Sequence, residues 1–214
     1  EYGEGLYSCK KCGLVKPELR EENDLENKRW ESGCPNCHNS LLPIPTDETT
    51  QLNCHSVYAI NKRTQEDMSL TVGKAFKIPT VALRYFNVYG PRQSLSNPYT
   101  GVAAIFIGRI KAGKPPVIFE DGLQSRDFVS VHDIVVANIA VMKKSSADYQ
   151  IFNVGSGNKI TILDLAKLLI KIFGSNLQAE ITNQFRTGDI RHCFADITKI
   201  KKTLGWKPEI RFDE

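Results

Sequence analysis

Residues 80–88, which read Thr-Val-Ala-Leu-Arg-Tyr-Phe-Asn-Val, decide the fold. This run is largely apolar and rich in β-branched and aromatic residues, so it predicts a strand that is buried on both faces. A helix is predicted just before it, over residues 56–76, because apolar residues recur there near helical spacing and Pro79 follows. The pair indicates an α/β unit.

The same alternation continues toward the C-terminus. Further helices are predicted at residues 101–112, 132–143, 162–173 and 197–205, and further strands at 117–119 and 151–154. Ser130-x-x-Asp133 and Thr161-x-x-Asp164 have the spacing of capping boxes at two of these helix starts. Residues 46–214 are therefore predicted to form one α/β domain with a mostly parallel sheet.

Residues 1–45 differ from the rest and are predicted to form a zinc-ribbon-like insert. They contain two C-x2-C pairs, separated by 21 residues, at Cys9, Cys12, Cys34 and Cys37. Two thiolates on each of two knuckles complete a tetrahedron around one ion, so the pattern predicts a structural zinc with no coordination position left for substrate. The alternatives are scattered structural cysteines or redox pairs, and His38 is a weaker candidate ligand.

Composition excludes several classes of protein. With 28 Lys+Arg against 24 Asp+Glu, the net charge of +4 over 214 residues does not suggest nucleic-acid binding. The insert carries six basic and eight acidic residues, which argues against a phosphate-binding module. No apolar run approaches the ~20 residues of a membrane span. No secretory signal opens the chain, so we expect a cytoplasmic protein with reduced cysteines.

Tyr58 and Lys62 lie four residues apart, hence on one face of the predicted helix. An ammonium beside a phenol favours the ionised phenolate, which is a suitable general base toward a sugar hydroxyl. The pattern alone is weak, because such pairs are common on solvated helices. Its context decides how it is interpreted.

Six further motifs follow the Tyr-x-x-x-Lys helix in order: Leu-Arg-Tyr-Phe-Asn-Val-Tyr-Gly-Pro-Arg-Gln (83–93), Asn-Pro-Tyr (97–99), Glu-Asp-Gly-x-x-x-Arg-Asp-Phe-Val (120–129), Phe-Asn-Val-Gly-Ser-Gly (152–157), Arg-Thr-Gly-Asp (186–189) and Leu-Gly-Trp (204–206). In order and spacing, residues 46–210 resemble the second half of an NAD-dependent epimerase/dehydratase of the extended short-chain dehydrogenase/reductase superfamily. The implied fold is the C-terminal part of a Rossmann-like doubly wound sheet, a small substrate-binding α/β lobe and the inserted zinc ribbon.

The resemblance also implies roles for individual residues around an NAD cofactor. Tyr58 would be the proton acceptor, Lys62 would bind the nicotinamide ribose, and Tyr85 and Phe86 would lie near the cofactor. The resemblance places Asn87 at the pyrophosphate of a nucleotide-diphospho-sugar substrate.

A second group of residues is implied at the nucleotide. Arg126 and Arg186 resemble the family's two phosphate-clamping arginines, and guanidinium forks suit a diphosphate. Phe119 would lie near the nucleobase, and Asp189 would order the loop that carries Arg186. The resemblance further implies a homodimer formed through the Tyr58 helix.

The sequence departs from the family pattern at its N-terminal end. The Gly-rich phosphate loop, the acidic residue for the adenosine ribose and the catalytic Ser/Thr are not among these residues. We therefore expect this chain alone neither to hold NAD firmly nor to turn over, and we attach the activity to the parent protein.

The reaction expected of the parent protein is 4-epimerisation of a nucleotide sugar through a 4-keto intermediate. The cysteine insert and the segment from Arg92 to Gly101 are similar to bacterial epimerases that act on dTDP-L-rhamnose, which makes that sugar the expected substrate. A UDP-glucose/UDP-galactose 4-epimerase, or a sugar-nucleotide dehydratase, decarboxylase or reductase, is the alternative within the superfamily. An alternative of another class is a non-catalytic zinc-ribbon interaction module on a nucleotide-binding scaffold.

Overall fold

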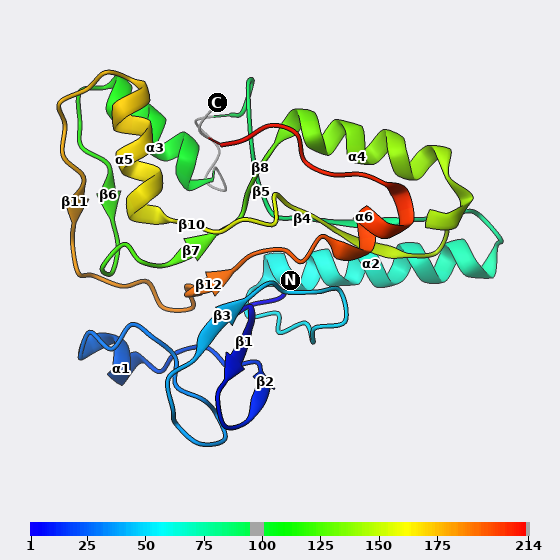
Figure 1. Ribbon diagram of the computed structural model, residues 1–214, viewed down its shortest axis with the longest axis horizontal. Coiled ribbons are helices and arrows are strands. Elements are labelled where there is room, and N and C mark those ends of the chain that lie inside the picture. Colours follow the sequence, from blue (N-terminus) through cyan, green and yellow to red (C-terminus); the bar gives the residue numbers. More distant parts are fainter. Residues whose placement is uncertain (95–100, 213–214) are drawn as a thin grey trace.

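Parallel strand pairs run through the middle of the molecule, with helices on both sides (Figure 1). The computed structural model describes residues 1–94 and 101–212. Its helices are α1 (Glu22–Glu26), α2 (Val57–Ala75), α3 (Val102–Lys111), α4 (Val131–Lys143), α5 (Ile162–Ile172) and α6 (Thr198–Leu204), with a 3-10 turn at Ser145–Ala147. In Figure 1, α2 and α4 lie on opposite sides of β4 and β5.

The strands are short. They are β1 (Leu6–Cys9), β2 (Gly13–Val15), β3 (Leu42–Ile44), β4 (Ala82–Tyr85), β5 (Asn87–Tyr89), β6 (Val117–Ile118), β7 (Ser125–Arg126), β8 (Phe128–Ser130), β9 (Ile151–Val154), β10 (Ile160–Thr161), β11 (Glu180–Ile181) and β12 (His192–Cys193). The pairs β4–β9, β5–β8, β6–β11 and β7–β12 are parallel, and only β7–β10 is antiparallel among the described strands after residue 45. The predicted mostly parallel α/β architecture is thus confirmed.

The prediction of one doubly buried strand over residues 80–88 is wrong. The chain pairs with β9 up to Phe86, whose N–H donates to the Val154 carbonyl, and then changes partner, because the Asn87 N–H donates to the Asp127 carbonyl. The run is therefore two strands, and Tyr85 remains 45% exposed. This change of partner brings residues 85–87 to the strand ends, where a site can form.

Two apolar cores stabilise the main body. The first packs β9 against α4 and α6, with Phe152, Val154 and Ile200 fully buried. The second packs α3 against α5 and β6 and forms a separate lobe, seen at one end of Figure 1. The apolar spacing of these helices predicted their buried faces.

One of the two predicted capping boxes is wrong. The Thr161 hydroxyl accepts from the Asp164 N–H at 3.0 Å, as expected, and donates to the Asp164 carboxylate. Ser130 instead caps the N–H of His132, and the Asp133 carboxylate accepts from the N–H groups of Glu209 and Ile210. Asp133 fixes the C-terminal segment because that segment folds back over the start of α4.

The cysteine-containing part forms the three-stranded antiparallel sheet β2–β1–β3. Its core is Tyr7, Cys9, Val15 and Cys34. The first residues of the chain, however, pack into the main body, since the Gly5 N–H donates to the His192 carbonyl at 2.8 Å. The division at residue 45 remains a prediction.

Within residues 1–94 and 101–212, no helix combines the length and apolar character that spanning a bilayer requires. The Asn-Pro-Tyr motif at 97–99 and most of the segment between Arg92 and Gly101 lie outside the described residues.

The fully buried Phe152 provides a test of the first core. Phe152→Ala should lower the free energy of unfolding by about 3–5 kcal/mol, because the side chain leaves a cavity among packed neighbours. Urea unfolding measures this change. Met142→Ala, at a side chain 84% exposed on α4, is the control and should stay within about 0.5 kcal/mol of wild type.

Candidate functional site

A cavity of about 540 Å³ opens between α2, the β4–β5 junction and the segment around β12. Residues predicted for the site from four elements line it: Tyr58, Lys62, Tyr85, Phe86, Asn87 and Arg126. The N-terminal residues Glu1 to Gly3 complete the wall. The fold therefore brings together the residues predicted for the cofactor and two of those predicted for the pyrophosphate of the substrate, Asn87 and Arg126.

The Tyr58 helix starts where the sequence predicts. Ser56 caps it by accepting from the Ala59 N–H at 3.1 Å, so Tyr58 and Lys62 fall in its first two turns. The Lys62 Nζ lies 5.7 Å from the centre of the Tyr58 ring. It also donates to Gln65 Oε1 at 3.3 Å. Tyr58 is 56% exposed, so its hydroxyl is accessible to a ligand.

Arg84 lines the same cavity and was not predicted as a site residue. Its guanidinium binds both carboxylate oxygens of Glu66 on α2, at 2.8 and 2.7 Å, and donates to the Tyr2 hydroxyl. That hydroxyl donates in turn to Asn153 of β9. Burial raises the pKa of the Tyr2 phenol, which keeps it a hydrogen-bond donor. The signal in the sequence is an arginine inside an apolar strand, which requires a buried partner.

Arg126 faces the cavity from β7 and is held by main-chain carbonyls. Its guanidinium donates to the carbonyls of Ser125 at 2.9 Å, Arg191 at 3.0 Å and Ile190 at 2.6 Å. Asp189 lies 3.6 Å away as its ion-pair partner. The carbonyls hold the guanidinium in one orientation, and a guanidinium is a suitable group for an anionic ligand.

Arg186 and Phe119 form a separate contact outside the cavity lining. The Arg186 guanidinium stacks on the Phe119 ring, 4.0 Å from its centre. The Asp189 N–H donates to the Arg186 carbonyl at 3.1 Å, which closes the loop between them. Asp189 thus links Arg186 to Arg126, but the structure does not bring the two arginines to one cavity. Their roles remain predictions.

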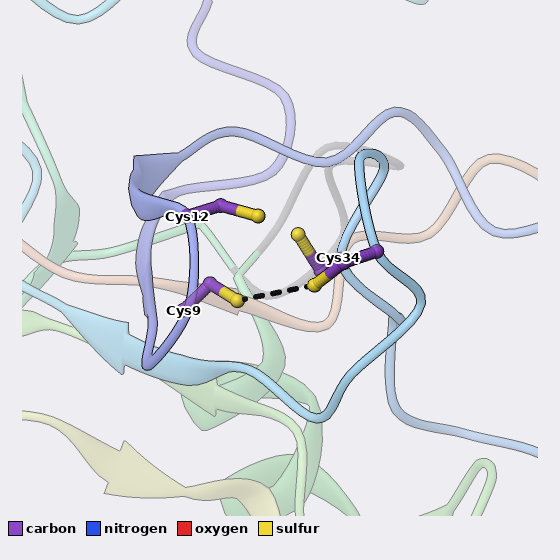
Figure 2. Close-up of side chains that lie close together, drawn as sticks. Cys9, Cys12 and Cys34 are labelled. Atoms are coloured by element: carbon purple, nitrogen blue, oxygen red, sulfur yellow. Dashed lines mark hydrogen bonds between the residues drawn. The ribbon is translucent and has the colours of Figure 1, made fainter.

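The four cysteines of the two C-x2-C pairs converge. Their sulfur atoms all lie within 4.8 Å of one another, with Cys9 and Cys37 at 3.5 Å. Figure 2 shows the sulfur atoms of Cys9, Cys12 and Cys34 directed toward one point. Tetrahedral zinc with bonds of about 2.3 Å places its sulfur ligands about 3.8 Å apart, so the cluster has the size of such a site. His38 is not part of this cluster.

The thiols of the cluster differ in pKa. Backbone N–H groups of Cys12 and Lys11 lower the pKa of Cys9 to about 7, whereas hydrogen bonding with Cys37 raises the pKa of Cys12 to about 12. A cation among them would favour four thiolates at once. All six cysteines of the chain lie in the described part, and none forms a disulfide.

Buried charges join the cysteine-containing module to the main body. Arg20 binds both carboxylate oxygens of Glu120 at 2.8 and 2.9 Å. From the other side Arg191 contacts Glu120 at 2.9 Å and Asp121 at 2.7 and 2.9 Å. Glu31 of the module binds Arg191 at 2.6 and 2.8 Å. We call these five residues the interlobe ion network.

The sequence did not predict this network. The charged run from Lys16 to Glu31 is visible, but the partners of Arg20 and Glu31 in the network lie 100 and 160 residues away in the chain. No local spacing connects them.

A Tyr-x-x-x-Lys helix packed on parallel strands, with a cavity at the strand ends, agrees with the resemblance to the extended short-chain dehydrogenase/reductase superfamily. Residues 35–155, more than half of the chain, match the model of the NAD dependent epimerase/dehydratase family. The chain belongs to this family, as its motifs predicted.

Similar curated proteins are nucleotide-sugar enzymes. The chain is 35% identical over 208 residues to a dTDP-L-rhamnose 4-epimerase of Burkholderia thailandensis, covering 97% of this chain and 56% of that protein. It is 37% identical over 160 residues to a UDP-glucuronate 4-epimerase of Thermodesulfobacterium geofontis, covering 74% of this chain and 47% of that protein. The chain thus spans about half the length of the curated relatives it matches.

Solved structures show the same likeness. A UDP-glucose 4-epimerase of Thermotoga maritima, crystallised with UDP-glucose, superposes with a TM-score of 0.75 and 38% identity, over 81% of this chain and 55% of that one. A UDP-glucuronic acid 4-epimerase of Bacillus cereus, in complex with UDP-glucuronic acid and NAD, superposes with a TM-score of 0.70 and 30% identity, over 79% of this chain and 52% of that one. The Rossmann-like epimerase fold is therefore confirmed.

Glu31 should make stability depend on pH. Burial acts to raise the pKa of its carboxyl, but hydrogen bonds from His192 and Arg191 outweigh burial and hold the pKa at about 2, below the ordinary 4.5. The stabilisation is therefore complete above the ordinary value and is lost as the pH falls toward about 2. Urea unfolding should show wild type more stable than Glu31→Gln near pH 6, with the difference shrinking near pH 3.

Glu26→Gln, an exposed carboxylate of α1, is the matched control and should unfold like wild type near pH 6. A difference between wild type and Glu31→Gln that grows on acidification would contradict the assigned contacts.

Proposed function

We propose that the protein containing this chain is an NAD-dependent nucleotide-sugar 4-epimerase, and that this chain supplies its substrate-binding part and its Tyr-x-x-x-Lys helix. The observation that carries the proposal is the cavity where Tyr58, Lys62, Asn87 and Arg126 meet. A general base, an ammonium and a phosphate-binding guanidinium are the groups that oxidation of a nucleotide-linked sugar hydroxyl requires. Epimerases of nucleotide sugars among the relatives support the same reaction.

The cavity residues fit the nicotinamide end of NAD. Lys62 offers ammonium donors for ribose hydroxyls beside the accessible Tyr58, and Tyr85 and Phe86 supply aromatic surface at the strand end. When bound, NAD supplies the hydride acceptor and donor for the sugar carbon. The rest of the dinucleotide would be held outside this chain's cavity.

The residues of this chain divide the remaining work. Tyr58 would take the proton of the sugar 4-hydroxyl and return it after the sugar has turned. Asn87 and Arg126 would bind the pyrophosphate, and Arg186 would add a second guanidinium at the nucleotide side, with Phe119 beside the base. Asp189 would keep the loop of Arg186 next to Arg126, as its contacts with both support.

For the substrate we propose dTDP-L-rhamnose. The support is the relative from Burkholderia thailandensis, which matches over 97% of the chain, including the cysteine-containing module. UDP-sugars are the second candidate, because the relatives and solved neighbours named above include enzymes of UDP-glucose and UDP-glucuronate. Incubating the full-length protein with dTDP-L-rhamnose and with UDP-galactose separates them.

We also propose that two copies associate through α2. The support is a row of apolar side chains on that helix and its C-cap that the described chain leaves 49–75% exposed: Val57, Ile60, Met68, Val72 and Phe76. Apolar surface of this extent is typical of an interface.

Tyr58→Phe tests the reaction. Removing the hydroxyl removes the general base, so turnover in the full-length protein should fall by about 10²–10⁴-fold. Exchange at C4 of the sugar, followed by NMR, measures it. Tyr149→Phe, outside the cavity lining, is the matched control and should keep wild-type turnover. Undiminished activity of Tyr58→Phe would favour the non-catalytic alternative.

The cysteine cluster should hold one zinc per chain. Cys34→Ser removes one of four thiolate ligands, so bound zinc should be lost and the module should unfold at lower temperature. Metal analysis by mass spectrometry and thiol titration measure this. Cys54→Ser, outside the cluster, should retain the metal. Wild-type protein without zinc, with four freely reactive thiols, would contradict the proposal.

A further inference from the structure

Charged side chains contact the main body from the cysteine-containing module. The side chains of Arg20, Glu120 and Arg191 are at most 2% exposed. Burying ion pairs of this kind stabilises a protein little, because desolvation offsets the attraction, but it fixes geometry. The interlobe ion network therefore has the character of a positioning device.

The first segment that the network holds carries Phe119. Glu120 follows Phe119 directly and has a φ of +54°, in the left-handed region that a non-glycine residue rarely adopts. Its N–H donates to the Gln184 carbonyl at 2.7 Å. Such a backbone persists only where the surroundings impose it, and here Arg20 and Arg191 grip its carboxylate from two sides.

The second segment carries Arg186 and supports Arg126. Arg20 also donates to the Asp189 carbonyl at 2.9 Å, and Glu31 grips the side chain of Arg191. The main-chain carbonyl of Arg191 is one of the acceptors that orient Arg126. Arg20 and Glu31 thus restrain both the segment that carries Phe119 and the segment that carries Arg186 and orients Arg126.

We propose that Arg20 and Glu31 are positioning residues for the nucleotide part of the substrate. Arg20 holds the Glu120 carboxylate and the Asp189 carbonyl, and Glu31 holds the Arg191 side chain. These contacts keep the Phe119–Arg186 stack and Arg126 in the arrangement that binds a nucleoside diphosphate. The inference rests on the proposed nucleotide-sugar function. It assigns the module a role in substrate affinity and leaves the chemical step to the Tyr58 side of the cavity.

Arg20→Met and Glu31→Gln in the full-length protein test this. Each should weaken binding of dTDP and UDP, measured by calorimetry, and raise KM for the nucleotide sugar, by at least about 10-fold. The value of kcat should stay within about 3-fold, because loosened binding affects substrate and transition state alike. Bound NAD and bound metal should be unchanged. A role in fold stability alone would not split KM from kcat in this way.

Asp24→Asn is the matched control, since it breaks an exposed ion pair with Arg29 in the same module, and it should leave KM and affinity as in wild type. Should Arg20→Met fail to fold because Glu120 keeps only Arg191 as its charged partner, Glu31→Gln decides, since the Glu31 side chain is 57% exposed. Wild-type affinity and KM in the variants, or a fall in kcat with KM unchanged, would overturn the inference. Wild-type protein that binds neither dTDP nor UDP would refute the proposed function, and the inference with it.

Discussion

The structure depends on one buried carboxylate, that of Asp127. It is fully buried, and it accepts hydrogen bonds from the N–H and hydroxyl of Ser156 and from the N–H groups of Gly157 and Ala195. Two segments distant in sequence, residues 156–157 and residue 195, are thereby tied to β8, which begins directly after Asp127. A methyl group at Gly155 would lie 2.6 Å from the carboxylate, so only glycine allows this approach.

The position of Asp127 also explains why the site forms where it does. Its carbonyl accepts the N–H of Asn87 at the point where the chain leaves β9 for β8, and its neighbour Arg126 faces the cavity. The network around Asp127 therefore places two predicted substrate ligands on one wall. On the opposite wall, the paired contact of Arg84 with Glu66 holds the Tyr58 helix against β4.

Local patterns predicted much of this from the sequence. Local patterns predicted α2 to α6 within a residue or two but not the short α1, and paired spacing predicted the cysteine cluster, because these signals lie within one or a few turns of chain. The partner change at Phe86 was missed, since it depends on where β8 lies. Asp133 was wrongly predicted as part of a capping box, because its carboxylate accepts hydrogen bonds from the N–H groups of Glu209 and Ile210, far along the chain. Arg20 and Glu31 were missed because ion pairs between distant segments leave no spacing in the sequence.

Under the proposed function, the surroundings of Tyr58 would serve the chemical step, and those of Arg126 and Arg186 would serve nucleotide binding. Around Tyr58 and Lys62 the surface is open, since Tyr58 is 56% exposed and Lys62 is exposed beside it. On the other side, main-chain carbonyls hold the Arg126 guanidinium, and Glu120 next to Phe119 has a positive φ. Arg20 and Glu31 of the cysteine-containing module contact both neighbouring segments. Segments fixed before binding lose less conformational entropy when a ligand arrives. Under the proposed function, these restrained segments would keep the nucleotide bound while the sugar turns beside Tyr58.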